Sequence, residues 1–171
     1  MFLKQIIFTL LIIFLLPACS IKHPQTAEEF RQGVPTAFMG MSESYTVNRP
    51  YDKVVKTIKR KAPKCLNVRV TTTSQTTTSY QVIVTKYKPT VIAGKKKTEL
   101  HIQQLHEQGV MNISEVPRGG YYLMVTDIVP AGKNKTKVTM YRPSMGIDTM
   151  VAAIKGWISG KNMGCPDLTK H

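Results

Sequence analysis

The residue types that most often do chemistry are sparse in this chain of 171 residues. Of the four histidines, His23 precedes the periodic part of the sequence and His171 is the last residue. His101 and His106 stand five positions apart in a strand-like segment, so they should lie on opposite faces and could not share a metal ion. No serine stands in a Gly-x-Ser-x-Gly nucleophile motif, and no close pair of carboxylates suggests a glycosidase. The sequence therefore predicts no catalytic residue, no metal site and no cofactor.

Cys19 stands at the end of an apolar segment. Lys4 gives the chain a basic start, and residues 6–16 are apolar except for Thr9. Such a segment has the size of a signal-peptide core and is too short to cross a bilayer, which takes a helix of about 20 residues. The run that follows resembles the lipobox of bacterial lipoproteins: Leu15-Leu16-Pro17-Ala18-Cys19-Ser20. An ordinary secretory signal with a chance cysteine is the alternative.

The lipobox resemblance implies that residues 1–18 are a signal peptide and that Cys19 becomes the lipidated N-terminus. Ser20 follows the cysteine at a position where lipoproteins retained in the inner membrane of enteric bacteria often carry aspartate. The resemblance therefore implies a protein on the periplasmic side of the outer membrane, with the membrane as a partner through the N-terminal lipid.

Cys65 and Cys165 remain once Cys19 is assigned to lipid. Two cysteines in the oxidising compartment that the lipobox implies most often pair with each other. Neither has a CxxC motif or clustered histidines beside it, so zinc is not expected. Both follow expected helices, so no helix dipole would favour a reactive thiolate. We expect a disulfide that closes a loop of about 100 residues.

The chain is strongly basic, with 24 Lys and Arg against 10 Asp and Glu. Its formal net charge of +14 would fall to +13 on loss of residues 1–18, where Lys4 is the single charged side chain. A nucleic-acid partner is not expected at a periplasmic address. Two explanations remain. One is an anionic envelope component such as phospholipid headgroups, lipopolysaccharide phosphates or acidic cell-wall polymer, and the other is a cationic soluble surface with no dedicated ligand.

We expect a lipidated tether over residues 19–42 and a single domain over residues 43–171. Proline and glycine punctuate the tether, and Thr26 could cap a short helix over 27–32 that need not dock. In the domain, apolar spacings of three and four predict a helix over about 51–62, ended by Pro63, and a long final helix with Ser144 as its cap and Gly160 after it.

The remaining periodic segments predict strands. Val, Ile, Thr and Tyr are abundant in them, and apolar residues on both faces of 120–129 predict a central strand. Pro89 is expected to end the third strand. The expected strands span about 43–48, 68–73, 79–88, 97–105, 110–116, 120–129 and 135–141.

Two expected hairpin turns are nearly alike, since residues 93–98 and 131–136 differ only where Lys96 stands against Asn134. They are not P-loops, because the earlier glycine and the Ser or Thr after the lysine are missing. They could be solvated turns, or a paired basic lip for an anionic group formed by Lys95, Lys96, Lys97, Lys133 and Lys135. Trp157 could likewise be a core anchor or contact an apolar ligand.

These elements predict an α+β fold in which an antiparallel sheet of about six to seven strands has an N-terminal helix and a long C-terminal helix packed on one face. The order resembles the helix-grip fold of the START and Bet v 1 superfamily, in architecture only, over about residues 44–165. That resemblance implies an apolar ligand between the sheet and the final helix. The competing architecture is the smaller helix-on-sheet domain of accessory lipoproteins in outer-membrane assembly machines.

Two functions of different classes follow. The first is a non-enzymatic interaction or accessory module that binds another envelope protein or an anionic envelope component. The second is a carrier that holds an apolar or amphipathic anionic ligand between the sheet and the final helix. The carrier needs an apolar cavity of about 300 Å³ or more, so the packing at that interface distinguishes the two.

Overall fold

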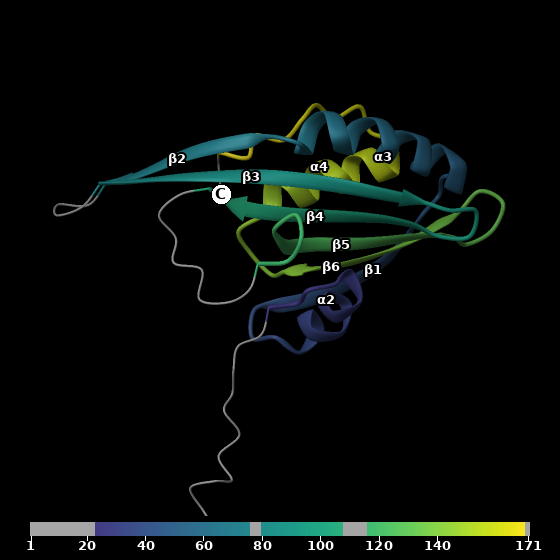
Figure 1. Ribbon diagram of the computed structural model, residues 1–171. Coiled ribbons are helices and arrows are strands. Elements are labelled where there is room, and N and C mark those ends of the chain that lie inside the picture. Colours follow the sequence, from purple (N-terminus) through teal and green to yellow (C-terminus); the bar gives the residue numbers. More distant parts are fainter. Residues whose placement is uncertain (1–22, 76–79, 108–115, 170–171) are drawn as a thin grey trace, which may run out of the picture.

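The computed structural model describes residues 23–75, 80–107 and 116–169. Within these residues, six strands form one antiparallel sheet in the order β1-β6-β5-β4-β3-β2. Helices α3 (Tyr51–Leu66) and α4 (Asp148–Ser159) cover one face of the sheet, and α2 (Ala27–Gly33) lies against the other (Figure 1). This is the α+β architecture with a C-terminal helix that the sequence predicts. The lipobox, His171 and almost all of the strand expected over 110–116 lie outside the described residues.

The six strands follow the alternation of their side chains. In β5 (Tyr121–Pro130), Met124 and Ile128 face the helices α3 and α4, while Val125 faces α2, and all three are fully buried. Pairing of this strand on both sides explains its apolar residues on both faces and confirms it as a central strand. The other strands are β1 (Gly40–Val47), β2 (Arg69–Gln75), β3 (Tyr80–Ala93), β4 (Thr98–His106) and β6 (Thr136–Pro143).

The expectation that Pro89 ends the third strand is wrong, because β3 continues to Ala93. The Tyr87 N–H donates to the Val68 carbonyl just before β2 begins. Pro89 lies two residues after Tyr87, where this edge of β3 has passed the end of β2. Pro89 therefore removes no hydrogen bond between β3 and β2, and on the other edge it still pairs with Ile102 of β4. The strand can therefore pass through the proline at no cost to the sheet.

The expected end of the first domain helix at residue 62 is also wrong, because α3 runs through Pro63 to Leu66. Cys65 and Leu66 are buried in the main core, and Cys65 is bonded to Cys165. Burial of these two side chains outweighs the backbone hydrogen bond that Pro63 cannot donate. The disulfide that the sequence predicts is confirmed, and it joins the end of α3 to the segment after α4.

Ser144 does not cap α4, which begins at Asp148 after Ile147 without a side-chain cap. The Ser144 N–H instead donates to the Met39 carbonyl, and this hydrogen bond joins the residue after β6 to the residue before β1. Gly160 ends α4 with φ of 91°, a left-handed conformation that glycine adopts without strain.

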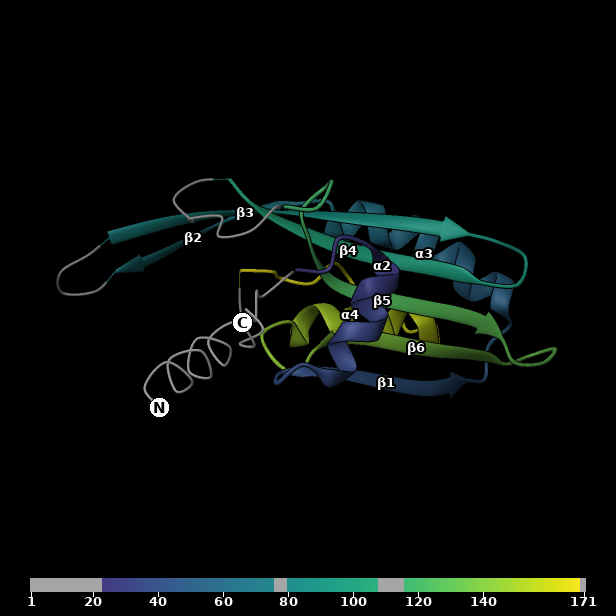
Figure 2. The ribbon, with the colours of Figure 1, turned by 60° about the horizontal axis from the view of Figure 1, so that its bottom comes forward.

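Helix α2, which precedes the first strand, is docked on the sheet. Thr26 caps α2 by accepting a hydrogen bond from the Glu29 N–H, as the sequence predicts. Phe30 is buried with Val125 of β5 in a second, smaller core on the face opposite α3 and α4 (Figure 2). The chain is therefore folded onto the sheet from α2 onward, and the expected boundary between tether and domain at residue 42 lies inside β1. The prediction of a tether did not account for the apolar side of α2, which is buried against the sheet.

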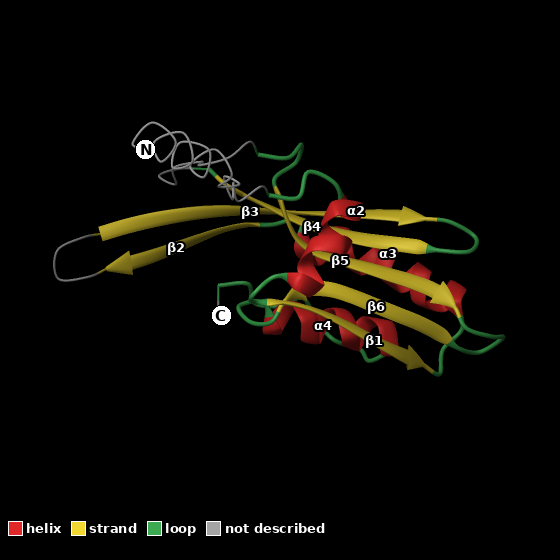
Figure 3. Cartoon of the chain, turned by 90° about the horizontal axis from the view of Figure 1, so that it is seen from below, coloured by secondary structure: helices red, strands yellow, loops and turns green. Residues whose placement is uncertain are grey.

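Two further features complete the architecture. β2 and the first part of β3 extend beyond the other strands as a two-stranded arm (Figure 3), since β4 pairs with β3 only from Thr85 onward. Among the described helices, none combines the length and apolar character that crossing a membrane requires.

Candidate functional site

The space between the sheet and α4 is filled by side chains. From α4, Met150, Ile154 and Ile158 are at most 1% exposed. They meet a layer of fully buried sheet residues, namely Leu100, Ile102, Met124, Ile128, Val138 and Met140. This is the packing of a protein interior, in which voids larger than a water molecule are few.

Trp157 belongs to the same core. Its ring is fully buried, and its indole N–H donates to the carbonyls of Met163 and Gly164, at 3.2 Å each. Met163 also packs against Gly156, where even one added carbon atom would clash with its sulfur. Trp157 therefore ties the segment after α4 back onto the helix. Of its two sequence interpretations, the core anchor is the one that this geometry supports.

Two hollows lie on other surfaces of the described chain. One, of about 450 Å³, runs along α3 and is lined by Asp52, Val55, Lys56, Lys59 and Arg60. The other, of about 290 Å³, is lined by Lys86, Lys88, Leu105, Val116, Pro117, Gly119 and Gly120. Neither lies between the sheet and α4.

The two similar turns lie at the same end of the sheet, because β3, β4, β5 and β6 are antiparallel neighbours in that order. Lys95, Lys96, Lys133 and Lys135 are exposed there. The Tyr51 hydroxyl at the start of α3 donates to the Gly94 carbonyl at 2.6 Å and contacts the Thr98 hydroxyl. The first of the two turns is therefore fastened to α3.

Lys97 does not share the environment of the other turn lysines. Its ammonium lies 3.0 Å from Glu99 and 3.2 Å from Asp127, on the face of the sheet that α2 covers. Burial would lower the pKa of Lys97, but hydrogen bonds to these two carboxylates raise it. The structure thus places the Lys97 ammonium in a partly exposed ion cluster on the α2 side of the sheet, apart from the proposed basic lip.

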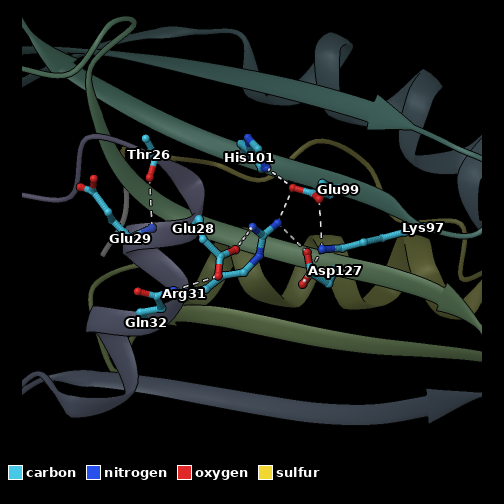
Figure 4. Close-up of polar contacts among 9 residues, drawn as sticks. All are labelled: Thr26, Glu28, Glu29, Arg31, Gln32, Lys97, Glu99, His101 and Asp127. Atoms are coloured by element: carbon cyan, nitrogen blue, oxygen red, sulfur yellow. Dashed lines mark hydrogen bonds and ion pairs between the residues drawn. The ribbon is translucent and has the colours of Figure 1, made fainter.

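The centre of that cluster is Arg31 of α2, which the sequence analysis did not single out. Its guanidinium pairs with Glu99 and, at 2.9 Å, with Asp127 (Figure 4). His101 Nε2 lies 2.8 Å from Glu99 on the same face. Burial would raise the pKa of Glu99, but hydrogen bonds from His101, Lys97 and Arg31 outweigh it and lower that pKa to about 2. Strand alternation could have placed Glu99 and His101 on one face, but nothing local points to Arg31, which is 68 residues away from Glu99.

The cluster fastens α2 to the sheet, so we expect Arg31→Met to destabilise the protein by about 1–3 kcal/mol at neutral pH. Because Glu99 has a folded pKa of about 2 against an ordinary 4.5, its ionised form stabilises the fold above pH 4.5, and this contribution is lost as the pH falls towards 2. Arg31→Met should make that acid-dependent loss shallower in urea titrations. Arg69→Met, which removes an exposed pair with Glu107, should cost at most about 0.5 kcal/mol. Equal effects of both variants would contradict this role of Arg31.

His101 and His106 have separate hydrogen-bond partners in the structure. His101 contacts Glu99, whereas His106 lies with Nδ1 3.0 Å from the Thr85 hydroxyl. Across the described ranges, no three side chains of the His, Cys, Asp or Glu type come together as metal ligands.

Comparison with known proteins finds a weak structural similarity. No family model matches the chain, and no curated protein matches it. Among solved structures it is similar to the di-domain ARO/CYC BexL from the BE-7585A biosynthetic pathway, with 12% sequence identity and a TM-score of 0.32. The match covers 70% of this chain and 45% of that one, so the chain spans less than half of the protein it matches.

Proposed function

We propose that this chain is a non-enzymatic, lipid-anchored interaction module on the periplasmic side of the outer membrane. The lipobox-like run ending at Cys19 supports the anchor. The disulfide between Cys65 and Cys165 supports an oxidising compartment, because such bonds are rare where thiols are kept reduced.

The packing between the sheet and α4 is the observation that favours an interaction module over a carrier. A carrier of the helix-grip kind would hold its ligand there, and an apolar ligand needs a cavity of about 300 Å³ or more. Side chains occupy that place instead, and the ring of Trp157 is buried by protein on all sides. The filled space between the sheet and α4 in the described residues therefore supports a role through the surface.

The histidine contacts support the non-enzymatic part of the proposal. His101 is held in the ion cluster under α2, and His106 is hydrogen-bonded to Thr85.

The anchor is tested by fractionation. We expect Cys19→Ser to move the protein from the membrane pellet to the soluble periplasmic fraction, because that residue would carry the lipid. The matched control is the double variant Cys65→Ala/Cys165→Ala, which should remain with the membranes to the extent that it folds. Continued sedimentation of Cys19→Ser with the membranes would contradict the lipid anchor.

A further inference from the structure

The outward face of α3 carries a row of cations. Its exposed cationic residues, which we call the basic face, are Lys53, Lys56, Lys59, Arg60 and Lys64; Asp52 and Pro63 are also exposed on the helix. Among the ion pairs found in the described part of the chain, none includes any of these five side chains. By contrast, Glu43, Glu99, Glu107 and Asp127 elsewhere are each paired with a cation. The basic face therefore gathers five cations on one helix surface, and none of them has a partner among the ion pairs of the described residues.

A hollow runs along this face. The lining residues are Asp52, Val55, Lys56, Lys59 and Arg60; members of the set three or four positions apart lie on the same side of the helix, so together they form one stripe. Val55 is only partly buried and supplies an apolar floor between the charged side chains. The hollow is shallow and open to solvent, so an apolar side chain of a partner can rest against Val55 there.

The basic face continues onto the first turn. The hydrogen bond from the Tyr51 hydroxyl to the Gly94 carbonyl holds the beginning of α3 against the turn that carries Lys95 and Lys96. Both of these lysines are exposed. Cations from two separate segments thus adjoin one another at the end of the sheet, and their potentials add over a distance of about a Debye length.

The position of the anchor decides which way this face points. The His23 ring lies 4.7 Å from the Tyr121 ring at the start of β5, and α2 follows on the sheet face opposite α3 (Figure 2). Four residues from Cys19 to His23 can span at most about 14 Å. If Cys19 is lipidated, the face with α2 is held near the membrane. The basic face then points away from it, and the headgroups of the anchoring membrane are not its ligand.

We propose that the basic face of α3 binds an acidic segment of another protein. In this complex an apolar side chain of the segment rests on Val55, and the carboxylates that flank that side chain in the segment pair with the cations of the basic face. The proposal rests on the proposed function, since it takes the orientation from the lipid anchor. A segment of protein fits better than a cell-wall polymer because the hollow has an apolar floor as well as a cationic rim. Electrostatic attraction would steer the encounter and weaken with added salt.

Binding of a labelled acidic peptide tests the proposal. The probe is a short peptide of aspartates and glutamates with one central phenylalanine, titrated against the mature lipoprotein in non-ionic detergent and followed by fluorescence anisotropy. We expect Lys56→Glu/Lys59→Glu/Arg60→Glu to weaken binding by at least about tenfold, because attraction at the rim becomes repulsion. The neutral variant Lys56→Gln/Lys59→Gln/Arg60→Gln should weaken it by a smaller factor.

The matched control reverses the same number of charges on the other face of the sheet. Lys86, Lys88 and Lys137 are exposed, and each is next in sequence to a buried core residue that faces the helices. Lys86→Glu/Lys88→Glu/Lys137→Glu should weaken peptide binding by less than about threefold. Two of these lysines also line the second hollow, so this control distinguishes the two hollows as well.

Three results would overturn the proposal. Equal weakening by the two charge-reversal variants would show a general effect of net charge. Equal binding of a peptide with serine in place of phenylalanine would remove the role of Val55. Binding of anionic vesicles or cell-wall fragments through the same three residues, without binding of the peptide, would assign the face to another ligand. Membrane fractionation of the Cys19→Ser variant reports separately on the anchor, so failure of the proposed function would be recognised independently.

Discussion

Replacing Cys65 and Cys165 together by alanine is expected to lower the free energy of unfolding by about 4.7 kcal/mol, the loop-closure value for a crosslink of this length. The two residues are 100 positions apart, so the bond removes a large loop from the unfolded ensemble. It also joins the C-terminal end of α3 to the segment that Trp157 holds, so its loss removes the covalent link between α3 and the chain that follows α4. Alanine is the suitable replacement because Cys65 is only 3% exposed, and serine would bury a hydroxyl.

Urea unfolding of the chain without residues 1–19 measures this loss directly. The oxidised protein compared with the same protein after reduction provides a matched control, because only the bond differs. Thiol labelling of the denatured, unreduced protein should modify neither Cys65 nor Cys165. A decrease of less than about 1 kcal/mol would show that the crosslink contributes little beyond the packing around it.

Trp157→Ala is expected to cost about 3–5 kcal/mol, the range for removing a large buried aromatic side chain. The ring fills the space between α4, the sheet and the segment around Met163, and its indole N–H is hydrogen-bonded to two backbone carbonyls. Because a stable domain has only about 5–15 kcal/mol to lose, much of the population would unfold at moderate temperature. Thermal and urea unfolding measure the effect.

The control for Trp157→Ala is the same type of truncation at an exposed apolar residue just before α4. Met145 is 59% exposed, so Met145→Ala should change the free energy of unfolding by at most about 0.5 kcal/mol. Similar small effects of both substitutions would contradict the role of Trp157 as a core anchor. They would reopen its interpretation as a residue that contacts a ligand.

The sequence predicts most of the fold because local patterns carry it. Alternation identifies the strands that the described residues contain, apolar spacing identifies α3 and α4, and the cysteine count identifies the disulfide. The errors at Pro63 and Pro89 have a common cause. Local rules treat proline as a stop, whereas tertiary burial in α3 and an open edge in β3 make it tolerable.

The candidate site is less accessible to sequence reasoning. The spacing of lysines in α3 could be seen in advance, but their lack of ion-pair partners depends on where the few acidic residues lie in space. Lys97 shows the reverse case. It stands in a basic turn beside Lys95 and Lys96, yet its side chain belongs to a cluster with Asp127 and Arg31 that only the folded sheet brings together. Charge patterns along a sequence do not reveal such long-range pairs.

Native mass spectrometry of the mature lipoprotein, extracted in mild detergent and followed by lipid analysis of the purified fraction, tests the central claim most directly. The account predicts a mass equal to the lipidated chain, with bound apolar molecules far below one per protein and unchanged by Trp157→Phe, because the space between the sheet and α4 is filled. An apolar or amphipathic molecule retained at one per chain, and lost on that substitution, would contradict the interaction module and identify a carrier.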